Sequence, residues 1–430
     1  MLAQAPEESR FTIASYRHAD REGGAGFPSA SDSDLVDGFP LLMNVTTGAI
    51  VEPVFRYLYE RAVRTTRLRL TSARAAADNL RLWWGYLEWR QLPYDQATSG
   101  DIEAYHRGLK RLVSPQTGTR IAEGTLRQRM THVVEFYRWA NARGLTTIAD
   151  RFLADKDNLS GGRPLESRVH ALTYEEWRLV RPLVGPLPTD SDYHPEQNRC
   201  RDRLTWELMV HSGMRRMEMC AITLQQVRSL IAQTSASDND FALRTFRLTE
   251  VKGGPRKARD ALVPVWLIRN LEAYARGAER QAAEDTYARY NCGALPDRFF
   301  LNHANSSRAP GAPLKEAQVD SVFNQVMRQA GLIETTQAVD PATGRTYERV
   351  VATHCVHDLR HTAAVWRYMA ERACGNPAPW NSVQVMLGHT NASTTTKIYL
   401  QITNVFEAAV SDAALHFFRR LGSESSVGPR

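Results

Sequence analysis

The chain has 430 residues, 43% of them hydrophobic and 23% charged, which is the composition of a globular protein and not of a disordered one. This length predicts two or three domains, and no apolar run approaches the roughly 18 residues that a membrane-spanning helix needs. Residues 1–40 lack the apolar centre of a signal peptide, and the five cysteines include no Cys-x-x-Cys pair. We therefore expect neither secretion nor a disulfide framework nor a zinc ribbon, and we expect the chain to work in the cytoplasm.

The formal net charge is +7, and its distribution indicates where a polyanion would bind. Residues 1–40 carry 3 basic and 7 acidic side chains, whereas residues 41–160 carry 18 basic and 12 acidic ones, so the positive charge lies on the body of the chain. Only 6 of the 54 basic residues are lysines, and arginine can bind a phosphate through two parallel hydrogen bonds. An arginine-rich surface suits a nucleic-acid backbone, although a GC-rich coding bias accounts for the composition equally well.

Residues 41–154 are predicted to form a small all-helical domain, after an acidic segment of residues 1–40 that is rich in Gly, Ser and Asp and expected to be flexible. Three helices of this domain are indicated by apolar residues spaced three and four apart, with Thr71 or Ser72 capping the first and Gly144 ending the third. Their apolar faces contain, helix by helix, Leu80, Trp84 and Leu87; Ile102, Tyr105, Leu109 and Leu112; and Leu126, Met130, Val133, Tyr137 and Ala140.

A polar, turn-rich stretch at residues 155–168 is the expected linker to a second domain, residues 169–403. An amphipathic helix and tail follow at residues 404–430.

The second domain is predicted to be mostly helical, and a capping box of Thr173 and Glu176 opens its first helix. Within it, residues 241–249 alternate like a strand, and residues 261–265 form the expected return strand after a Lys-Gly-Gly-Pro turn. The fold class is therefore mainly α with a small β-sheet, an all-helical domain followed by an α+β domain.

Four short motifs of the second domain are unusual in combination. In chain order they are His211-Ser-Gly-Met-Arg215-Arg-Met-Glu218, Val251-Lys252-Gly-Gly-Pro-Arg-Lys257, His354-Cys-Val-His357-Asp-Leu-Arg360-His361-Thr362, and Leu387-Gly-His389-Thr with Tyr399 ten residues further on. Each motif alone is weak, but in order and spacing the four resemble the catalytic domain of the tyrosine recombinases, also called the phage integrase family. The resemblance covers residues 165–405 by motif, and the helical segment 55–153 looks like that family's core DNA-binding domain.

The resemblance implies a catalytic set, residue by residue. It consists of Arg215, Lys252, His357, Arg360, His389 and the nucleophile Tyr399, with Glu218 and His361 in supporting positions. The implied enzyme is a site-specific recombinase that cleaves and rejoins DNA strands through a 3′-phosphotyrosyl intermediate and uses neither metal nor ATP nor another cofactor. Its expected role is integration or excision of a mobile element, and chromosome resolution stays open as an alternative.

The chemistry of these side chains fits those roles. The transition state at phosphorus concentrates negative charge on the non-bridging oxygens, which the guanidiniums of Arg215 and Arg360 can match. A tyrosine has a pKa of about 10 and needs help to attack, and His357 can accept its proton. Lys252 on a turn can protonate the departing 5′ oxygen, and His389 can donate a hydrogen bond to a phosphate oxygen.

Several positions have alternatives. The rivals of the same residue type are Arg216 for Arg215, Lys257 for Lys252, and Tyr368, in a buried-looking run, for Tyr399. His354, Cys355, His357 and His361 could form a metal cluster instead, but no glutamate follows His357 as in His-Glu-x-x-His and no second Cys/His pair lies nearby. No metal site is therefore expected, and Cys355 is expected to be buried.

The expected partner is double-stranded DNA, held in a C-shaped clamp of the two domains, with phosphate contacts from Arg120, Arg127 and Arg129, which lie on or beside the third helix, and from Lys257. By the resemblance, we expect a homo-oligomer, a tetramer on two DNA sites, in which residues 404–430 dock on the next protomer; packing of this segment on its own domain is the alternative. Other recombinases or directionality factors are candidate partners, a membrane is not, and the expected location is the nucleoid of a bacterium.

Two departures from the family pattern stand out. Residues 273–299 and 335–348 look longer than a minimal catalytic domain needs, and they are expected to be loops that touch DNA or a neighbouring protomer, or solvent-exposed insertions. No separate accessory DNA-binding domain is expected, because residues 1–40 are acidic. Two other functions stay open, namely a type IB topoisomerase that relaxes supercoils without a partner site, and a DNA-binding protein with a vestigial active site.

Overall fold

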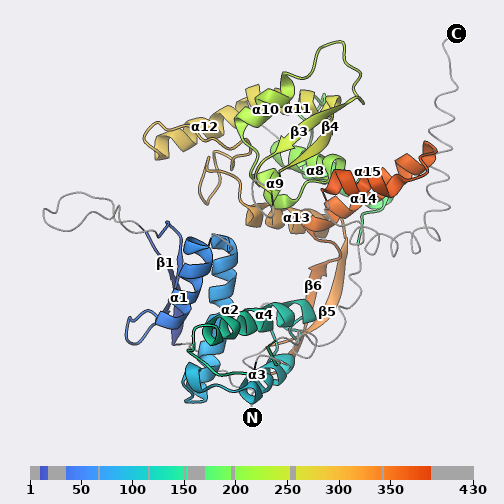
Figure 1. Cartoon of the computed structure of the whole chain (residues 1–430). Coiled ribbons are helices and arrows are strands. Elements are labelled where there is room, and N and C mark those ends of the chain that lie inside the picture. The colour runs from blue at the N-terminus through green and yellow to red at the C-terminus, as the bar shows by residue number, and fades with distance from the viewer. Residues whose placement is uncertain are drawn as a thin grey trace, which may run out of the picture. The chain divides into compact units, whose positions relative to one another are not determined.

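The computed structural model places two compact units along the chain, coloured by residue number in Figure 1. The first unit combines Met1–Glu166 with Gln337–Arg349, and the second combines Ser167–Thr336 with Val350–Arg430. The residues that the structure describes are 10–17, 35–65, 68–114, 117–149, 152–153, 170–194, 199–251, 258–340 and 343–388. Among them, no helix is both long enough and apolar enough to cross a membrane.

The first unit packs helices against a small hairpin. Its elements are β1 (Phe11–Ser15), β2 (Pro40–Asn44), α1 (Glu52–Tyr59) with a π-helical extension (Glu60–Arg64), α2 (Leu70–Trp89), a 3-10 turn (Tyr94–Gln96), α3 (Ser99–Arg111) and α4 (Glu123–Asn141). The centre of the unit is the contact between α2 and α4, where the fully buried Trp83 donates from Nε1 to the hydroxyl of Tyr137 at 3.1 Å. Both rings are buried in the apolar core of the unit, and their polar atoms are hydrogen-bonded, Tyr137 to the carbonyl of Tyr94 at 3.1 Å.

The three helices predicted for this unit are present as α2, α3 and α4. The residues predicted on their apolar faces are buried, apart from Leu112, which is the half-buried C-cap of α3. The predicted cap of α2 was wrong, because the helix already begins at Leu70, after Arg69, whose side chain makes no capping hydrogen bond. Gly144 follows the end of α4 with φ 67°, a conformation that favours glycine.

Part of the acidic N-terminal segment is regular structure, which the sequence did not predict. β1 pairs antiparallel with β2, from Phe11 opposite Asn44 to Ser15 opposite Pro40, and the side chains of Phe11 and Phe39 are buried. The alternation of Phe11 and Ile13 is the signal for this strand, and the acidic composition around it obscured that signal.

The second unit is mostly helical, with short two-stranded sheets. Its elements are α7 (Tyr174–Val184), α8 (Arg201–Ser212), α9 (Arg216–Cys220), α10 (Leu224–Ile231), β3 (Leu243–Leu248), β4 (Arg259–Pro264), α11 (Val265–Arg276), α12 (Ala278–Tyr290), α13 (Glu316–Gln329), β5 (Ile333–Val339), β6 (Thr346–Ala352), α14 (Val356–Ala373) and α15 (Pro379–Leu387). The capping box predicted for α7 is present, with Thr173 N donating to Glu176 Oε2 at 2.7 Å and Glu176 N donating to Thr173 Oγ1 at 3.2 Å. The mainly α fold with small sheets is confirmed.

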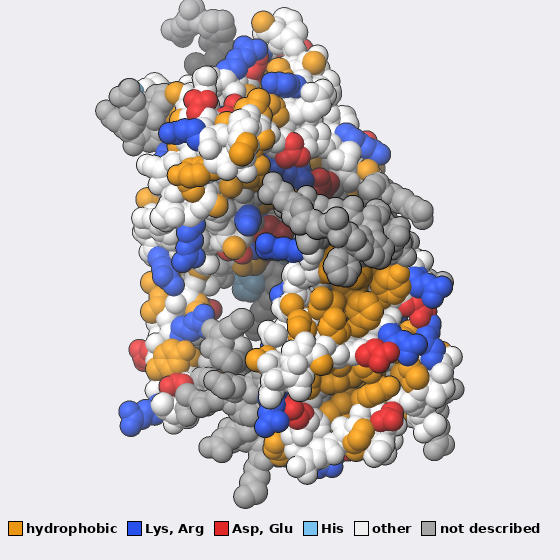
Figure 2. Space-filling model, turned by 90° about the vertical axis from the view of Figure 1, so that its left-hand side faces the viewer, with side chains coloured by type: hydrophobic (Ala, Val, Ile, Leu, Met, Phe, Trp, Pro, Cys, Tyr) orange, Lys and Arg blue, Asp and Glu red, His pale blue; other side chains and the backbone are white. Residues whose placement is uncertain are grey.

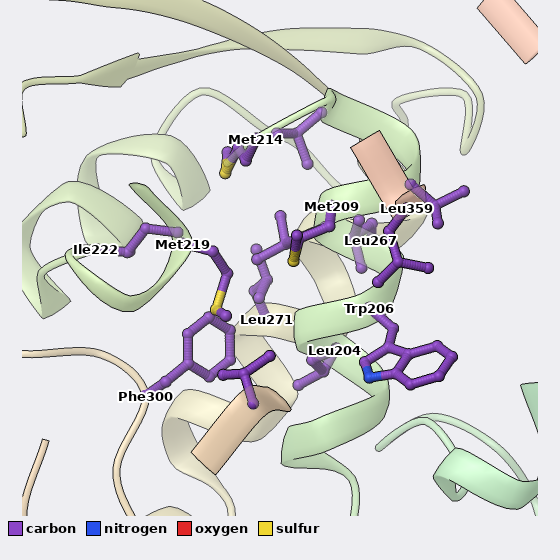
Figure 3. Packing of buried hydrophobic residues seen from close by; sticks show 14 of the residues in the cluster. Leu204, Trp206, Met209, Met214, Met219, Ile222, Leu267, Leu271, Phe300 and Leu359 are labelled. Atoms are coloured by element: carbon purple, nitrogen blue, oxygen red, sulfur yellow. The ribbon is translucent and has the colours of Figure 1, made fainter. Parts of the chain in front are cut away.

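Helix α8 is the central helix of the second unit, and nearly all of its residues are buried. Trp206 on α8 stacks on Phe323 of α13 with ring centroids 4.9 Å apart. Figure 3 shows the same helix surrounded by apolar side chains from several elements, including Leu267, Leu271 and Leu359. Because α8 is almost wholly buried, the core fixes the position of Gly213 at its C-terminal end.

The two long stretches flagged in the sequence are regular elements and not open loops. The first contains α12, whose Arg280 is 1% exposed and donates from Nε to the carbonyl of Phe299 at 3.0 Å. The second is the β5–β6 hairpin, whose residues 337–349 belong to the first unit, where Val339 N donates to the carbonyl of Gly118 at 2.6 Å. The expected linker at 155–168 and the C-terminal segment at 404–430 lie outside the described residues.

Candidate active site

The turn between α8 and α9 positions the first arginine of the set. Gly213 is the C-cap of α8 with φ 63°, a left-handed conformation that glycine adopts without strain, and Arg215 is the N-cap of α9. The flanking Met214 and Met219 are both fully buried in the core shown in Figure 3. Arg215 is therefore fixed at its backbone by the core, while its side chain is 24% exposed.

Glu218 binds Arg215 twice, as its spacing in the sequence predicts. Oε1 of Glu218 accepts from Nη1 of Arg215 at 2.9 Å, and Oε2 accepts from the backbone N–H of Arg215, also at 2.9 Å. Burial works against the charge on this carboxylate, but hydrogen bonds and charge from Arg259, together with those from Arg215, outweigh it and hold the pKa of Glu218 below its usual value. The carboxylate therefore stays ionised beside the guanidinium.

The rival arginine is engaged elsewhere. Arg216 donates from Nε to Glu316 Oε2 at 2.9 Å and from Nη1 to Asp320, both on α13. Its guanidinium thus ties α9 to α13, whereas that of Arg215 binds Glu218 on its own helix.

Helix α14 carries the third motif in its first turns. Arg360 is 2% exposed, and its guanidinium donates from Nη1 to the carbonyl of Gly213 and from Nη2 to the carbonyl of Leu387 at 2.6 Å. His357, one turn earlier, is exposed, and its ring lies 4.8 Å from that of His361 at nearly a right angle. The contact with Gly213 brings α14 against the turn that bears Arg215.

Four further candidates lie outside the described residues, namely Lys252, Lys257, His389 and Tyr399. The chain on either side of the lysines is placed by the β3–β4 ladder, which ends with Leu248 opposite Arg259. The chain before His389 is placed by α15, whose C-cap Gly388 has φ 63°. Tyr368, the rival of Tyr399, lies against Trp380 with ring centroids 4.2 Å apart.

The remaining residues of the third motif hold the start of α14. His354 lies between Glu176 on α7, at 3.3 Å, and Asp358, at 3.8 Å. Cys355 is exposed, contrary to the prediction that it is buried, because it is the N-cap of α14 and its side chain stands outside the first turn. Within the described part of the chain, no three His, Cys, Asp or Glu side chains are grouped so as to hold a metal ion.

The arginines predicted to contact DNA differ in exposure. Arg120 is exposed before the start of α4, whereas Arg127 and Arg129 are half-buried on that helix, and burial lowers the pKa of Arg129. Many other arginines of the first unit form ion pairs, such as Arg61 with Glu135 at 2.9 Å. On the face drawn in Figure 2, basic side chains are scattered among acidic, hydrophobic and uncharged ones, so the charge of that face is mixed.

Arg259 is a residue of the site that the sequence reasoning missed. It is buried at the start of β4, and its Nη2 lies 2.6 Å from Oε2 of Glu218. The sequence prediction started the return strand at residue 261, whereas the observed strand starts at Arg259, so that Arg259, Ala261 and Val263 alternate on one face and all three are buried. An arginine in register with two core residues indicates a buried partner for its charge.

Comparisons with known proteins agree with this geometry. A profile of the phage integrase family matches residues 189–404, half of the chain. The tyrosine recombinase XerC of Halalkalibacterium halodurans is 23% identical over 66% of this chain and 72% of its own, and that of Roseiflexus sp. is 24% identical over 75% and 78%. In the solved structures, the XerH site-specific recombinase has the same fold, with a TM-score of 0.52 and 14% identity over 84% of each chain. The chain belongs to the phage integrase family and is a tyrosine-type site-specific recombinase.

Proposed function

We propose that this recombinase cleaves and rejoins duplex DNA through a covalent 3′-phosphotyrosyl intermediate, with Tyr399 as the nucleophile. The observation that carries the proposal is the convergence at Gly213, whose carbonyl accepts from Arg360 while Arg215 follows two residues later. Two arginines held at one turn of the chain can provide the positive charge that a phosphodiester transition state requires.

In the proposed reaction, the phenolic oxygen of Tyr399 attacks phosphorus and the bond to the 5′ oxygen breaks. His357, exposed on the first turn of α14, accepts the phenolic proton, and Lys252 gives a proton to the departing oxygen. His389 donates a hydrogen bond to a phosphate oxygen. One phosphoester bond replaces another, so the 5′-hydroxyl of a second strand can reverse the step on a new partner, and no ATP is needed.

Hydrogen bonds to the protein fix the orientation of both guanidiniums. Arg360 uses two of its N–H groups on backbone carbonyls, which fixes the orientation of the group before DNA arrives. Arg215 is held on one edge by Glu218. Preorganised donors of this kind stabilise developing charge without reorganising during the reaction.

We further propose that the partners are double-stranded DNA and other copies of this chain, as a tetramer on two sites. The XerH recombinase of the comparison is bound to a palindromic difH substrate, and a palindrome offers the same half-site twice. Residues 404–430 would dock on the next protomer. Deleting them is expected to leave DNA binding intact and to abolish pairing of two sites; equal loss of both would contradict the docking role.

The biological role that we propose is integration or excision of a mobile element, in keeping with the description of the family as phage integrases. Sequencing the DNA that flanks the gene, in cells that express it and in cells that do not, tests this role. Rejoined element ends in the expressing cells would support it, whereas recombination at a single chromosomal site away from the gene would contradict it.

The covalent step is tested with a nicked suicide duplex that traps the intermediate. Its sequence is first selected by binding to the chain from a randomised duplex library. The wild type is expected to form a covalent adduct and Tyr399→Phe to form none, because the phenolic oxygen is the attacking atom. Tyr368→Phe is the matched control and should retain the adduct. Adducts that survive in Tyr399→Phe would exclude Tyr399 as the nucleophile.

Two assays of the wild-type chain separate the two other functions. A type IB topoisomerase would relax a supercoiled plasmid that lacks the selected site, and a protein with a vestigial site would bind the duplex without forming any adduct. A recombinase is expected to do neither.

A further inference from the structure

Arg259 shares the carboxylate of Glu218 with Arg215. Its Nη2 donates to Oε2 at 2.6 Å, and its Nε lies 3.4 Å from Oε1. The same two oxygens accept from Arg215, one from the backbone N–H and one from Nη1, each at 2.9 Å. The side chain of Glu218 is fully buried, so the charges that balance it come from these two arginines at its sides.

The other N–H groups of Arg259 reach two backbone segments that border the site. Nη2 lies 3.3 Å from the carbonyl of Gly213, which also accepts from Arg360, and Nη1 donates to the carbonyl of Met386 at 2.5 Å. Met386 lies near the end of α15, three residues before His389 in the sequence. One side chain from β4 therefore joins the turn before Arg215 to the end of the helix before His389.

Gly388 is the residue that allows this approach. A β-carbon added at Gly388 would lie 2.4 Å from Cδ of Arg259, closer than two such atoms can come. Two physical constraints therefore favour glycine at this position of the Leu-Gly-His motif. They are its left-handed φ of 63° and the aliphatic part of the Arg259 side chain beside it.

Removing Arg259 would leave the buried negative charge of Glu218 with one cationic partner instead of two. A buried carboxylate with one of its two cationic partners missing is costly, and it would draw the remaining guanidinium into a full two-pronged pair. The N–H groups of the Arg215 guanidinium that could otherwise reach a phosphate would then be engaged by Glu218. The position of Arg215 therefore depends on the arginine that holds the opposite side of the carboxylate.

We propose that Arg259 is a positioning residue for strand cleavage, which occupies one side of Glu218 and fastens the carbonyls of Gly213 and Met386 so that Arg215 stays directed at the DNA phosphate. This inference rests on the proposed function, in which Arg215 binds the scissile phosphate. In this proposal Arg259 acts through Arg215 and not on the phosphate itself.

The test is single-turnover covalent capture of the selected nicked duplex by Arg259→Met, at saturating DNA. We expect the rate to fall about 100-fold, the size of effect that misplacement of a catalytic group produces, while the affinity for the duplex changes little. The matched control is Arg203→Met, which removes another buried arginine that pairs with a glutamate, Glu207, and donates to the carbonyls of Arg181 and Gly185. This control should lose stability but keep the wild-type rate per folded molecule.

A double-mutant cycle shows whether Arg259 acts through Arg215. If it does, Arg259→Met added to Arg215→Ala slows capture little further, because the group that it positions is already gone. An equal loss in both backgrounds would overturn the inference, and so would a rate for Arg259→Met equal to that of Arg203→Met. Should Arg259→Met fail to fold, Arg259→Lys keeps the charge beside Glu218 but cannot reach both carbonyls, and about a tenfold loss is expected.

The result also separates this inference from the proposed function. A wild-type chain that forms no adduct with the selected duplex would overturn the proposed function, and the inference with it. Capture by the wild type, with none by Tyr399→Phe and an unchanged rate in Arg259→Met, would overturn the inference alone.

Discussion

Nε2 of His354 lies 3.3 Å from Oε1 of Glu176, and this contact joins the start of α14 to the start of α7. Burial opposes the charge on His354, but its contacts with Asp358 and Glu176 outweigh that effect and raise its pKa to about 9. The hydrogen bond with His354 is the main cause that lowers the pKa of Glu176 to about 2. Both groups are therefore charged through the neutral range, and they hold the helix that carries His357 and Arg360.

The first prediction is that the protein loses the stability contributed by His354 as the pH rises from about 6.5 to about 9. A histidine whose pKa rises on folding contributes fully below its unfolded value of about 6.5, and the contribution disappears as the pH passes the folded value of about 9. Glu176→Gln keeps the capping contact with Thr173 but removes the charge, so its stability should depend less on pH in this window, with a difference from the wild type on the order of 1–2 kcal/mol at pH 6. Denaturant unfolding at a series of pH values measures it.

The control for this experiment is Glu175→Gln, an exposed neighbour that pairs only with Arg178 at 3.7 Å in the described part of the chain. Its curve should run parallel to that of the wild type. If Glu176→Gln also runs parallel, the ion pair with His354 contributes nothing to the pH dependence.

The second prediction separates the two adjacent arginines. Arg215→Ala should slow covalent capture of the suicide duplex by about 10²–10³-fold, the usual cost of removing a donor that stabilises transition-state charge. Arg216→Ala should retain capture within a few-fold and lower the unfolding temperature slightly, because Arg216 ties α9 to Glu316 and Asp320. The opposite ranking would assign the catalytic role to Arg216.

The third prediction concerns Gly388. Gly388→Ala places a β-carbon against Cδ of Arg259 and imposes a left-handed φ on alanine, so it should destabilise the protein by about 2–4 kcal/mol. The matched control is Gly375→Ala, which has φ 78° but no atom within 4 Å of the added carbon, and which should cost only about 1 kcal/mol. Similar losses for the two variants would show that the contact with Arg259 adds no cost.

The fourth prediction tests the core of the second unit. Trp206→Ala leaves a cavity beside Phe323 and should cost about 3–5 kcal/mol of unfolding free energy. Trp89→Ala, at a position that is 48% exposed, should cost far less. Chemical denaturation of the two variants, side by side, checks the difference.

The fifth prediction concerns salt. If Arg120 contacts a phosphate, Arg120→Ala should weaken binding to any duplex and reduce the slope of log affinity against log salt by about one. Arg56→Ala, which removes an exposed arginine paired with Glu52 at 3.7 Å, is the control and should keep the wild-type slope. A salt-independent affinity of the wild type would contradict a grip on the DNA backbone.

The periodic part of the fold was predictable from the sequence. Apolar spacing located α2, α3 and α4, because a helix that buries one face must repeat its apolar residues every three to four positions. The paired strands β3 and β4 followed from alternation on either side of a turn. Strand β1 was missed because five residues within an acidic segment give a weak signal, and the strand is held by long-range contacts, its pairing with β2 and its packing against α2.

Contacts within the site were predictable from the sequence only between residues that lie a few positions apart. The pairing of Arg215 with Glu218 spans three residues, so the first turn of a helix brings them together. The bond from Arg259 to Glu218 spans 41 residues, and that from Arg360 to the carbonyl of Gly213 spans 147. Such contacts depend on how whole elements pack, which no local pattern in the sequence specifies.

Because part of the β5–β6 hairpin belongs to the first unit, that unit cannot be completed until the hairpin has been synthesised. Its residues 337–349 belong to that unit, and Ala338 and Val339 lie against Gly118, where a β-carbon would come within 2.5 Å of Ala338 Cβ. During synthesis, the N-terminal unit therefore emerges from the ribosome with one of its own pieces still about 170 residues away, roughly ten to thirty seconds of translation. A fragment ending at residue 166 would lack these residues, so the surface around Gly118 would stay exposed.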